Sequence, residues 1–414
     1  MRLWPACNRM RICLFARAMP EHSHGGMEHH ARCLALGLIQ RGHAVSVLTT
    51  ARPGGGPAYV EDPCPTWFLP APAGRYSAAW WQESAAAFAR LHAQAPFDLV
   101  WSQSAAGLGY LEQLQPALRV PAVAIMHGSM RGELVRRREP WPSLPGLVRT
   151  ALYLPEYVHF ARRWRRAGPR LSRAIVPSAE LAADNQRELR LPPERVPVVP
   201  LGVDLARFRP DPAAAAALRG RLGLAPEAPV LLVAGRLSRQ KGAHVALAAL
   251  QRLRAGAPPP YLLLAGEGRE AGPLQRTAAR LGVAERVLFL GRVPQEELAA
   301  CYNLADLCLF PWLGWEAFPL SLLEALACGR PVVASCIGGA PSLLQMAEVG
   351  RLVPPGDACA LTGAIASLLA EPDQRRRMAS NARALAEAEF GLETMVVRTE
   401  AIFASCLEGG AAHE

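Results

Sequence analysis

The chain is 414 residues long, 51% hydrophobic and 19% charged, which favours a well-packed globular protein with more than one core. No apolar run reaches the ~18 residues needed to cross a bilayer, so we do not expect a transmembrane protein. The formal net charge of +10 favours an anionic partner, such as a nucleotide, a phospholipid surface or nucleic acid.

In the first half of the chain, short β-rich runs alternate with helical stretches rich in Ala and Leu. A helix is expected over 28–41, and irregular insertions are expected over 53–80 and 128–170. Strands are expected at 11–15, 44–49, 66–69, 97–101, 120–125 and 174–176. This alternation is typical of a parallel sheet with helices on both faces.

The second half repeats the same alternation. Helices are expected over 244–254 and 320–328. Strands are expected at 196–199, 230–234, 261–265, 287–290, 307–310, 331–335 and 350–353. Prolines punctuate the chain between 176 and 210, where we expect the two series to join. The fold class is therefore α/β, with two doubly wound domains, and the cleft between the domains is the expected ligand site.

The ten cysteines are scattered, with no C-x-x-C pair. Cys13, Cys308 and Cys336 stand in apolar, strand-like runs, which favours reduced, buried thiols in a cytoplasmic protein over a disulfide or zinc framework. The first 17 residues combine basic residues with only a short apolar run, so we do not expect a signal peptide.

A glycine pair, Gly25-Gly26, follows the first expected strand and precedes a helix. Glycines here let the backbone approach a ligand, and a helix N-terminus favours negative charge. An ordinary flexible turn is the alternative. Four histidines crowd the same loop, but no Cys, Asp or i,i+4 pair completes a metal-binding set. These histidines are His22, His24, His29 and His30.

His127 follows the strand expected at 120–125 and precedes Gly128. A side chain at the carboxyl end of a parallel strand lies at the ligand-binding edge of the sheet, where imidazole can donate a hydrogen bond. A purely structural histidine is the alternative.

Lys241 is the only lysine in the chain, and all other basic side chains, histidine aside, are arginine. It lies in the segment GRLSRQKG at 235–242, directly after an expected strand. A compact ammonium meets a phosphate as a point charge, and Arg236 can grip phosphate oxygens bidentately. The two cations would hold a diphosphate without a metal, consistent with the lack of any Asp-x-Asp pair. Codon bias and a solvated loop are the alternative.

Two glutamates, Glu316 and Glu324, are separated by seven residues. The first stands in a loop after a strand and the second inside an apolar helix. A buried carboxylate requires hydrogen-bond donors, and paired sugar hydroxyls would supply them. A capping box formed by Ser321 and Glu324 is the alternative.

Two further glycine pairs follow expected strands. Gly338-Gly339 is suited to presenting backbone N–H groups to a ligand. Gly266 and Gly268 hint at a dinucleotide fingerprint, but the spacing to Gly272 is too long and no acidic residue ends the next strand. We therefore expect no dinucleotide site.

In this order, the residues resemble the retaining glycosyltransferases of family 4, which have the GT-B fold. The resemblance covers nearly the whole chain and is densest over 24–50, 198–208 and 230–339. It implies two Rossmann-like domains facing across a cleft. The expected parts are an N-terminal acceptor-side domain, a C-terminal nucleotide-sugar donor domain, and a last helix that crosses back to the first domain. Their expected ranges are 1–175, 176–389 and 390–414.

The resemblance also implies roles for single residues. Gly25 and Gly26 would lie against the donor phosphate, and Arg236 and Lys241 would bind the diphosphate. Ser342 stands where the family commonly has glutamate.

For the rest of the donor, Glu316 would hydrogen-bond the transferred sugar and Glu324 the ribose, while His127 would lie beside the sugar at the reaction centre. Backbone contacts are expected from four residues. They are Phe318, Leu320, Gly338 and Gly339.

The expected activity is retaining, metal-independent transfer of a sugar from a UDP- or GDP-type nucleoside diphosphate sugar to an acceptor hydroxyl, without a cofactor. Glycan, glycolipid or cell-surface polysaccharide synthesis would use such a step. Front-face attack is expected, because no carboxylate is placed as a nucleophile. A non-catalytic nucleotide-sugar-binding subunit on the same fold is the alternative. A phosphorylase-like enzyme is disfavoured, because Lys241 is the only lysine that could anchor a cofactor.

A basic, partly aromatic segment at 160–173, with arginines at 136–138 upstream, lies in the expected acceptor domain. We expect a solvated basic surface here, and the alternative is a segment that rests on an anionic membrane and presents a lipid-linked acceptor. The sequence leaves the acceptor open, and a lipid-linked acceptor and an oligosaccharide are both compatible with it. We expect a cytoplasmic protein, with peripheral binding to the inner membrane face as part of the membrane alternative. Nucleic acid is not expected as a partner, because no recognition module is visible.

Overall fold

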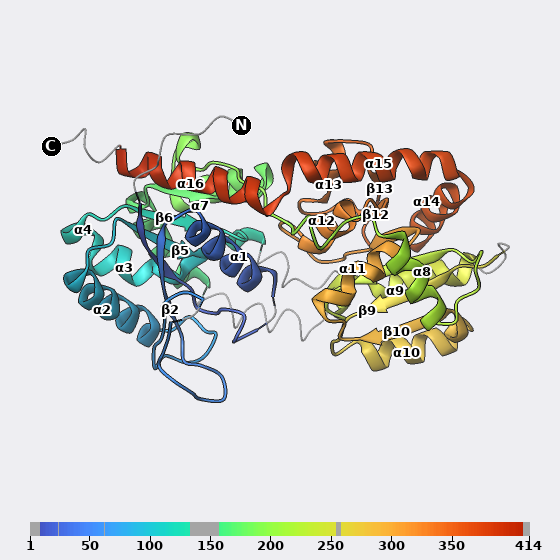
Figure 1. The fold of residues 1–414 in the computed structure, drawn as a ribbon, viewed down its shortest axis with the longest axis horizontal. Helices are drawn as coiled ribbons and strands as arrows, with labels where there is room; N and C mark the ends of the chain where they lie inside the picture. The colour runs from blue at the N-terminus through green and yellow to red at the C-terminus, as the bar shows by residue number, and fades with distance from the viewer. Residues whose placement is uncertain (1–8, 24, 62, 133–156, 254–257, 409–414) are drawn as a thin grey trace. The chain divides into compact units, whose positions relative to one another are not determined.

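The computed structural model describes residues 9–23, 25–61, 63–132, 157–253 and 258–408 (Figure 1). The chain divides into two compact units, an N-terminal domain of residues 1–201 with 392–414 and a C-terminal domain of residues 202–391. The first boundary lies later than the sequence-based one at 175. A β-bridge joins Val176 to Val198, and Val199 packs in the N-terminal core, so this segment stays with the first sheet.

The N-terminal domain is built on a seven-stranded sheet. In spatial order its strands are β3 (Tyr59–Val60), β4 (Thr66–Phe68), β2 (Ala44–Thr49), β1 (Arg11–Phe15), β5 (Leu99–Gln103), β6 (Ala122–Ile125) and β7 (Arg173–Ile175). All neighbours pair in parallel except β3, which is antiparallel to β4. The central strands are apolar and buried along nearly their whole length, as expected when helices cover both faces.

The helices of this domain include one from the very end of the chain. They are α1 (Gly26–Gln40), α2 (Ala78–Gln94), α3 (Leu108–Gln113), α4 (Gln115–Leu118), α7 (Ala179–Leu189) and α16 (Leu392–Glu408). The final helix α16 packs on α1 (Figure 1), where Gly37 leaves room for Val396. Glu400 accepts a hydrogen bond from Arg41 at 2.6 Å and pairs with the buried His43 at 2.7 Å.

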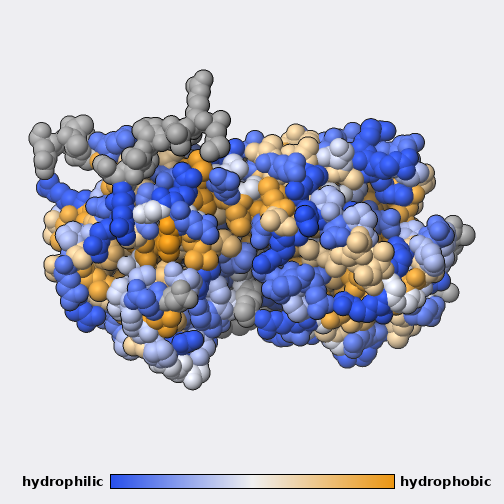
Figure 2. Space-filling view, in the orientation of Figure 1, coloured by the Kyte–Doolittle hydropathy of each residue, from blue (hydrophilic) through white to orange (hydrophobic). Residues whose placement is uncertain are grey.

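The C-terminal domain contains a six-stranded, fully parallel sheet. In spatial order its strands are β10 (Val287–Gly291), β9 (Tyr261–Ala265), β8 (Val230–Ala234), β11 (Leu307–Phe310), β12 (Val332–Ser335) and β13 (Gly350–Val353). Its helices are α8 (Pro212–Arg221), α9 (Ala243–Arg252), α10 (Ala271–Arg280), α11 (Gln295–Leu304), α12 (Leu320–Ala327), α13 (Ala340–Gln345), α14 (Ala358–Ala370) and α15 (Pro372–Glu389). The outer side of α15 is strongly hydrophilic (Figure 2).

The α/β class with two doubly wound domains is confirmed, and the differences have local causes. Residues 196–199 form a single bridge rather than a strand, because Pro197 cannot donate to a ladder. The segment 53–80 contains the short strand β3 instead of being irregular throughout. Residues 157–167 are helical, and the remainder of the insertion before them, including 136–138, lies outside the described residues. Cys336 is exposed rather than buried, because β12 ends one residue earlier.

Candidate functional site

Three loops of the C-terminal domain follow the carboxyl ends of the neighbouring strands β8, β9 and β11, and backbone hydrogen bonds join them. The Leu237 N–H donates to the Glu267 carbonyl oxygen at 2.7 Å. The Leu313 N–H donates to the Gln240 carbonyl oxygen at 2.8 Å. The loop with the two predicted phosphate-binding cations is therefore fixed by its neighbours on both sides.

Glycines make this close approach of backbones possible. Gly242 has a φ of +70°, and a Cβ there would overlap the Pro311 carbonyl oxygen. Gly266, with a φ of +152°, lies in the same way against the Gly235 carbonyl. A Cβ at Gly268 would overlap the Leu237 carbonyl. Backbone packing thus explains the glycine pattern that imitates a dinucleotide fingerprint.

Lys241 and Glu316 are brought together by these loops. The Lys241 Nζ lies 3.0 Å from the Glu316 Oε2, and each side chain is 24% exposed. The same ammonium lies 5.5 Å from the centre of the buried Trp312 ring, a cation–π contact that the sequence analysis missed. Arg236 is exposed and makes no ion pair with any residue that the structure describes. A phosphate could therefore recruit both cations, at the cost of separating Lys241 from Glu316.

The Gly338-Gly339 pair supports the Glu316 loop. Gly338 has a φ of +60°, and a Cβ there would overlap the Glu316 carbonyl oxygen. The Gly339 N–H donates to that same carbonyl at 3.0 Å. The Gly339 N–H is therefore already engaged in holding this loop, and the predicted ligand contacts of Gly338 and Gly339 stay predictions.

Glu324 is held by a tyrosine that the sequence analysis did not single out. The Tyr302 hydroxyl, on α11, donates to the Glu324 Oε2 at 2.7 Å. Burial raises the pKa of Glu324 to about 7, and the Tyr302 hydrogen bond and the charge of Arg207 oppose that rise. The capping-box alternative is wrong, because α12 begins after Pro319 and Ser321 lies inside the helix.

The two remaining backbone predictions fall around the start of α12. Leu320 is its first residue, so its N–H has no acceptor within the helix. The Phe318 ring packs edge-on against Phe390, with 6.2 Å between the ring centres. Both backbone contacts stay predictions.

In the N-terminal domain, Gly25 is the N-cap of α1 and Gly26 its first residue. The carboxylate of the buried Glu28 folds back over this turn, so that a Cβ at Gly25 would overlap its Oε2. A side chain at position 25 would therefore require the Glu28 carboxylate to move. The predicted phosphate contact of the two glycines stays a prediction.

His127 is partly buried and contacts the buried side chains of Gln103 and His30. Its Nε2 lies 2.5 Å from the amide nitrogen of Gln103, and its ring meets His30 edge-on with 4.8 Å between ring centres. Burial lowers the pKa of His127 to about 4, so the ring is neutral at pH 7. With Gln103 donating, Nε2 accepts, which places the single ring proton on Nδ1. Gln103 also donates to the Met27 carbonyl at 3.2 Å.

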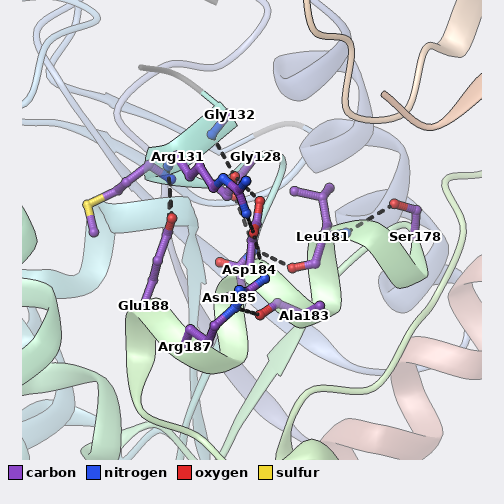
Figure 3. A network of polar contacts seen from close by, with 12 residues as sticks. Gly128, Arg131, Gly132, Ser178, Leu181, Ala183, Asp184, Asn185, Arg187 and Glu188 are labelled. Atoms are coloured by element: carbon purple, nitrogen blue, oxygen red, sulfur yellow. Dashed lines mark hydrogen bonds and ion pairs between the residues drawn. The ribbon is translucent and has the colours of Figure 1, made fainter. Parts of the chain in front are cut away.

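The backbone that follows His127 is anchored to α7 (Figure 3). Asn185 donates to the Gly128 carbonyl at 3.3 Å. The Glu188 carboxylate accepts hydrogen bonds from the backbone N–H groups of Met130 and Arg131, both at 2.8 Å. Burial raises the pKa of Glu188. These α7 side chains sit one helical turn apart, a pattern that carries no specific signal in the sequence.

The loop histidines are engaged separately. The His22 Nε2 lies 3.1 Å from the Thr50 carbonyl, and His29 contacts Cys33. His24 lies outside the described residues. Within the described ranges, no group of three or more His, Cys, Asp or Glu side chains could hold a metal ion. None of the helices in those ranges has the length and apolar character that crossing a bilayer requires.

The basic segment at 160–173 is only partly free. Arg163 donates twice to Glu112, at 3.0 and 2.6 Å, and its guanidinium lies 4.0 Å from the centre of the Trp81 ring. Arg163 is therefore not available for a membrane. Three neighbouring arginines are exposed: Arg162, Arg165 and Arg166.

Comparison with known families agrees with this arrangement. Residues 24–207 match the family described as Glycosyltransferase Family 4, and residues 215–385 match Glycosyl transferases group 1. A GDP-mannose-dependent alpha-(1-6)-phosphatidylinositol monomannoside mannosyltransferase of Mycolicibacterium smegmatis is 37% identical over 302 residues, covering 70% of this chain and 72% of that protein. The chain belongs to glycosyltransferase family 4, and it is a glycosyltransferase.

Other relatives and solved structures extend the likeness. A D-inositol 3-phosphate glycosyltransferase of Segniliparus rotundus is 38% identical over 223 residues, covering 53% of this chain and 49% of that protein. Sucrose-phosphate synthase from Thermosynechococcus elongatus has a TM-score of 0.80 at 24% identity, covering 97% of this chain and 100% of that one. Anabaena HepE in complex with UDP and glucose has a TM-score of 0.73 at 22% identity, covering 96% and 100%. These structures confirm the GT-B fold.

Proposed function

We propose that this protein transfers a hexose from a GDP-linked donor, GDP-mannose first, to a phosphatidylinositol-type glycolipid. The anomeric configuration is retained and no metal is required. Support for the donor and acceptor comes from the mannosyltransferase relatives of Mycolicibacterium smegmatis and Mycobacterium tuberculosis, of which 72% and 76% are covered. UDP-linked donors are the second choice.

The observation that carries the proposal is the contact between Lys241 and Glu316 at 3.0 Å. In such a transfer, negative charge accumulates on the departing diphosphate, and preorganised cations stabilise it. The ammonium of Lys241 exchanges Glu316 for a phosphate oxygen, and Arg236 adds a bidentate contact. Glu316 is then free to accept hydrogen bonds from sugar hydroxyls, so one exchange serves both ends of the donor.

Retention is proposed to proceed by front-face attack. The bond from the anomeric carbon to the diphosphate oxygen breaks, the acceptor oxygen bonds to the same face, and the departing phosphate oxygen takes the acceptor proton. His127, with a pKa of about 4, acts as a neutral hydrogen-bonding group for the sugar rather than as a cation. Trapping a covalent glycosyl-enzyme with a slow donor analogue would contradict this route.

A donor screen on the full chain tests the proposal. GDP-, UDP- and ADP-hexoses are offered with phosphatidylinositol monomannoside or phosphatidylinositol in mixed micelles, in the presence and absence of EDTA. We expect GDP release and glycolipid product from GDP-mannose, unchanged by the chelator. Nucleotide binding without transfer to any acceptor supports the alternative of a non-catalytic binding subunit, and activity lost with EDTA contradicts the metal-independent route.

The unique lysine permits a direct test of donor binding. Reductive methylation with ¹³C-formaldehyde keeps the charge and labels the Lys241 ε-amine and the chain's terminal amine alone. We expect GDP, but not guanosine, to shift the Lys241 resonance, since only GDP carries the diphosphate. A Lys241 signal that GDP leaves unchanged would exclude the proposed phosphate contact.

Peripheral binding to an anionic membrane is proposed for the exposed arginines of the basic segment. Replacing Arg162, Arg165 and Arg166 together with Gln removes three charges, each worth about 1 kcal/mol near such a surface. We expect weaker sedimentation with phosphatidylglycerol vesicles and unchanged transfer to a soluble acceptor. Arg163→Gln serves as control, because Glu112 already neutralises Arg163. Equal sedimentation of the triple variant and the wild type would contradict membrane binding here.

A further inference from the structure

Three loops at the carboxyl edge of the N-terminal sheet are fastened to one another. They follow β1, β2 and β4, which are adjacent in the sheet. The buried Thr50 hydroxyl donates to the Arg17 carbonyl at 2.7 Å and accepts from the Gly74 N–H at 2.8 Å. The Ala51 N–H also donates to the Ala71 carbonyl at 3.0 Å. The loops therefore form one platform, at the edge where doubly wound domains bind ligands.

Arg17 extends from this platform, only two residues after β1. Its Nη1 donates to the Gly74 carbonyl at 3.2 Å, and its guanidinium lies 5.1 Å from the centre of the Tyr76 ring. The Nε is enclosed and has no hydrogen-bond partner. No carboxylate of the described residues lies within ion-pair distance of Arg17. The half-buried guanidinium is thus held in place by Gly74 and Tyr76. Its Nε lacks an acceptor, and its charge has no carboxylate partner among the described residues.

A second arginine on the same aromatic stack has its charge neutralised by a carboxylate. Tyr76 stacks on Trp81 with ring centres 6.1 Å apart and planes 11° apart. On Trp81 lies Arg163, which makes two hydrogen bonds to Glu112. The two guanidinium groups share the same stack, yet among the residues that the structure describes only Arg163 has a carboxylate partner. Because withdrawing an unpaired charge from water is costly, a half-buried guanidinium without a carboxylate partner among the described residues favours the binding of an anion.

A second cation stands on the neighbouring loop. Arg52, three residues after β2, lies with its guanidinium 5.6 Å from the centre of the Phe68 ring. Arg52, like Arg17, makes no ion pair within the described part of the chain. Planar guanidinium groups held on aromatic rings are preorganised for the oxygens of phosphate. Arg17 and Arg52 thus extend from adjacent loops of the platform, and a guanidinium favours a phosphate oxygen over a neutral hydroxyl.

We propose that Arg17, assisted by Arg52, binds a phosphate group of the acceptor. The inference rests on the proposed function, because it takes the N-terminal domain as the acceptor side. It adds that the acceptor is recognised as a phosphate ester and not through its hydroxyls alone. The phosphate belongs either to a lipid headgroup or to a soluble phosphorylated polyol.

Headgroup binding by the full chain tests the proposal. Calorimetry compares inositol 1-phosphate with unphosphorylated inositol, and transfer assays compare phosphatidylinositol micelles with soluble inositol 1-phosphate. We expect the wild type to bind the phosphorylated form, and Arg17→Gln to weaken that binding about tenfold or more. Arg17→Lys, which keeps the charge but loses the planar fork, should lie between them. Preference for the micellar or the soluble acceptor identifies the source of the phosphate.

Arg163→Gln is the matched control, since it removes a charge from the same stack but one that Glu112 already neutralises. We expect it to lower Tm while leaving phosphate affinity and GDP affinity unchanged. The proposal fails if Arg17→Gln, folded by its Tm and circular dichroism, binds inositol 1-phosphate like the wild type. It also fails if the wild type does not prefer inositol 1-phosphate to inositol, or if Arg17→Gln weakens GDP as much as the headgroup. If the wild type does not bind GDP, the result contradicts the proposed function and not this inference.

Discussion

The strand-end loops of the two domains are assembled by different means. In the C-terminal domain, backbone meets backbone, and Gly242, Gly266 and Gly338 are required where carbonyl oxygens leave no room for a Cβ. In the N-terminal domain, one backbone hydrogen bond, from Ala51 to Ala71, is supplemented by side chains, because the hydroxyl of Thr50 and the guanidinium of Arg17 also join the loops. Side-chain links can be exchanged for others more readily than backbone contacts can.

Under the proposed function, the two sets of loops recognise different ligands, the donor at the C-terminal domain and the acceptor at the N-terminal domain. A nucleoside diphosphate is a constant ligand, and a rigid backbone cradle with one charge pair is suited to it. Acceptors differ among related transferases, and a platform of substitutable side chains can be adapted to a new acceptor without rebuilding the fold. The following variants test the backbone-packed loops of the C-terminal domain, for comparison with the Arg17 variants of the N-terminal platform.

The largest effect is expected from Lys241→Ala. It removes the ammonium that we propose to stabilise the departing diphosphate, and loss of such a group typically costs about 10²- to 10³-fold in kcat. Arg239→Gln is the control, an exposed cation two residues away in the same loop. Steady-state transfer assays measure both. Equal activity of the two variants would show that this loop does not serve the donor.

Gly242→Ala should disturb the backbone cradle. The left-handed φ of +70° and the overlap with the Pro311 carbonyl force the loop to shift, at a cost of about 1–3 kcal/mol from backbone strain alone. Tm and GDP affinity should both fall. Gly220→Ala on α8, where a Cβ meets open space, should leave both unchanged or raise Tm slightly. A normal Tm in Gly242→Ala would mean that the cradle is softer than its contacts imply.

A smaller, more selective loss is expected from Tyr302→Phe. Without the hydroxyl, Glu324 loses the donor that fixes its Oε2. We expect about tenfold weaker GDP binding, in line with the loss of one charge-assisted hydrogen bond. Binding of 2′-deoxy-GDP should change less, because it cannot make the full ribose contact. If both nucleotides weaken equally, Tyr302 supports the fold and not ribose recognition.

The mildest signal is expected from pH. The pKa of Glu324 is raised from 4.5 to about 7, so its carboxylate forms as pH rises through neutrality. GDP affinity should therefore increase between about pH 6 and 8 in calorimetric titrations. The contribution of Glu324 to folding stability has the opposite sign, being present below pH 4.5 and lost as pH rises to about 7. Glu324→Gln should flatten both profiles.

Much of the fold could be read from the sequence, because buried parallel strands are nearly continuous apolar runs. β1, β2, β8, β9, β11 and β13 begin and end where those runs do. β3 was missed because two residues at a sheet edge leave no periodicity to detect. The stretch 196–199 has the apolar composition of a strand but is interrupted by a proline.

The candidate site was only partly readable. Lys241 and Glu316 stand out by rarity and spacing, and the structure brings them together. Tyr302 and Trp312 read as ordinary core residues, because nothing local indicates which distant side chain each contacts. Arg17 carries no signal in a chain so rich in arginine, since what distinguishes it is that no described carboxylate lies within ion-pair distance. Contacts between distant side chains, and the lack of an ion-pair partner, become visible only in the tertiary structure.

The return of α16 to the first domain constrains how the protein is made. Its residues Met395, Val396 and Phe403 complete the same core as Ile12 and Leu34. On the ribosome, that core stays incomplete until the entire second domain has been translated. Until α16 is made, the apolar side chains of this core that contact α16 stay uncovered. A messenger truncated near its end would then yield a well-formed second domain joined to a first domain prone to aggregation.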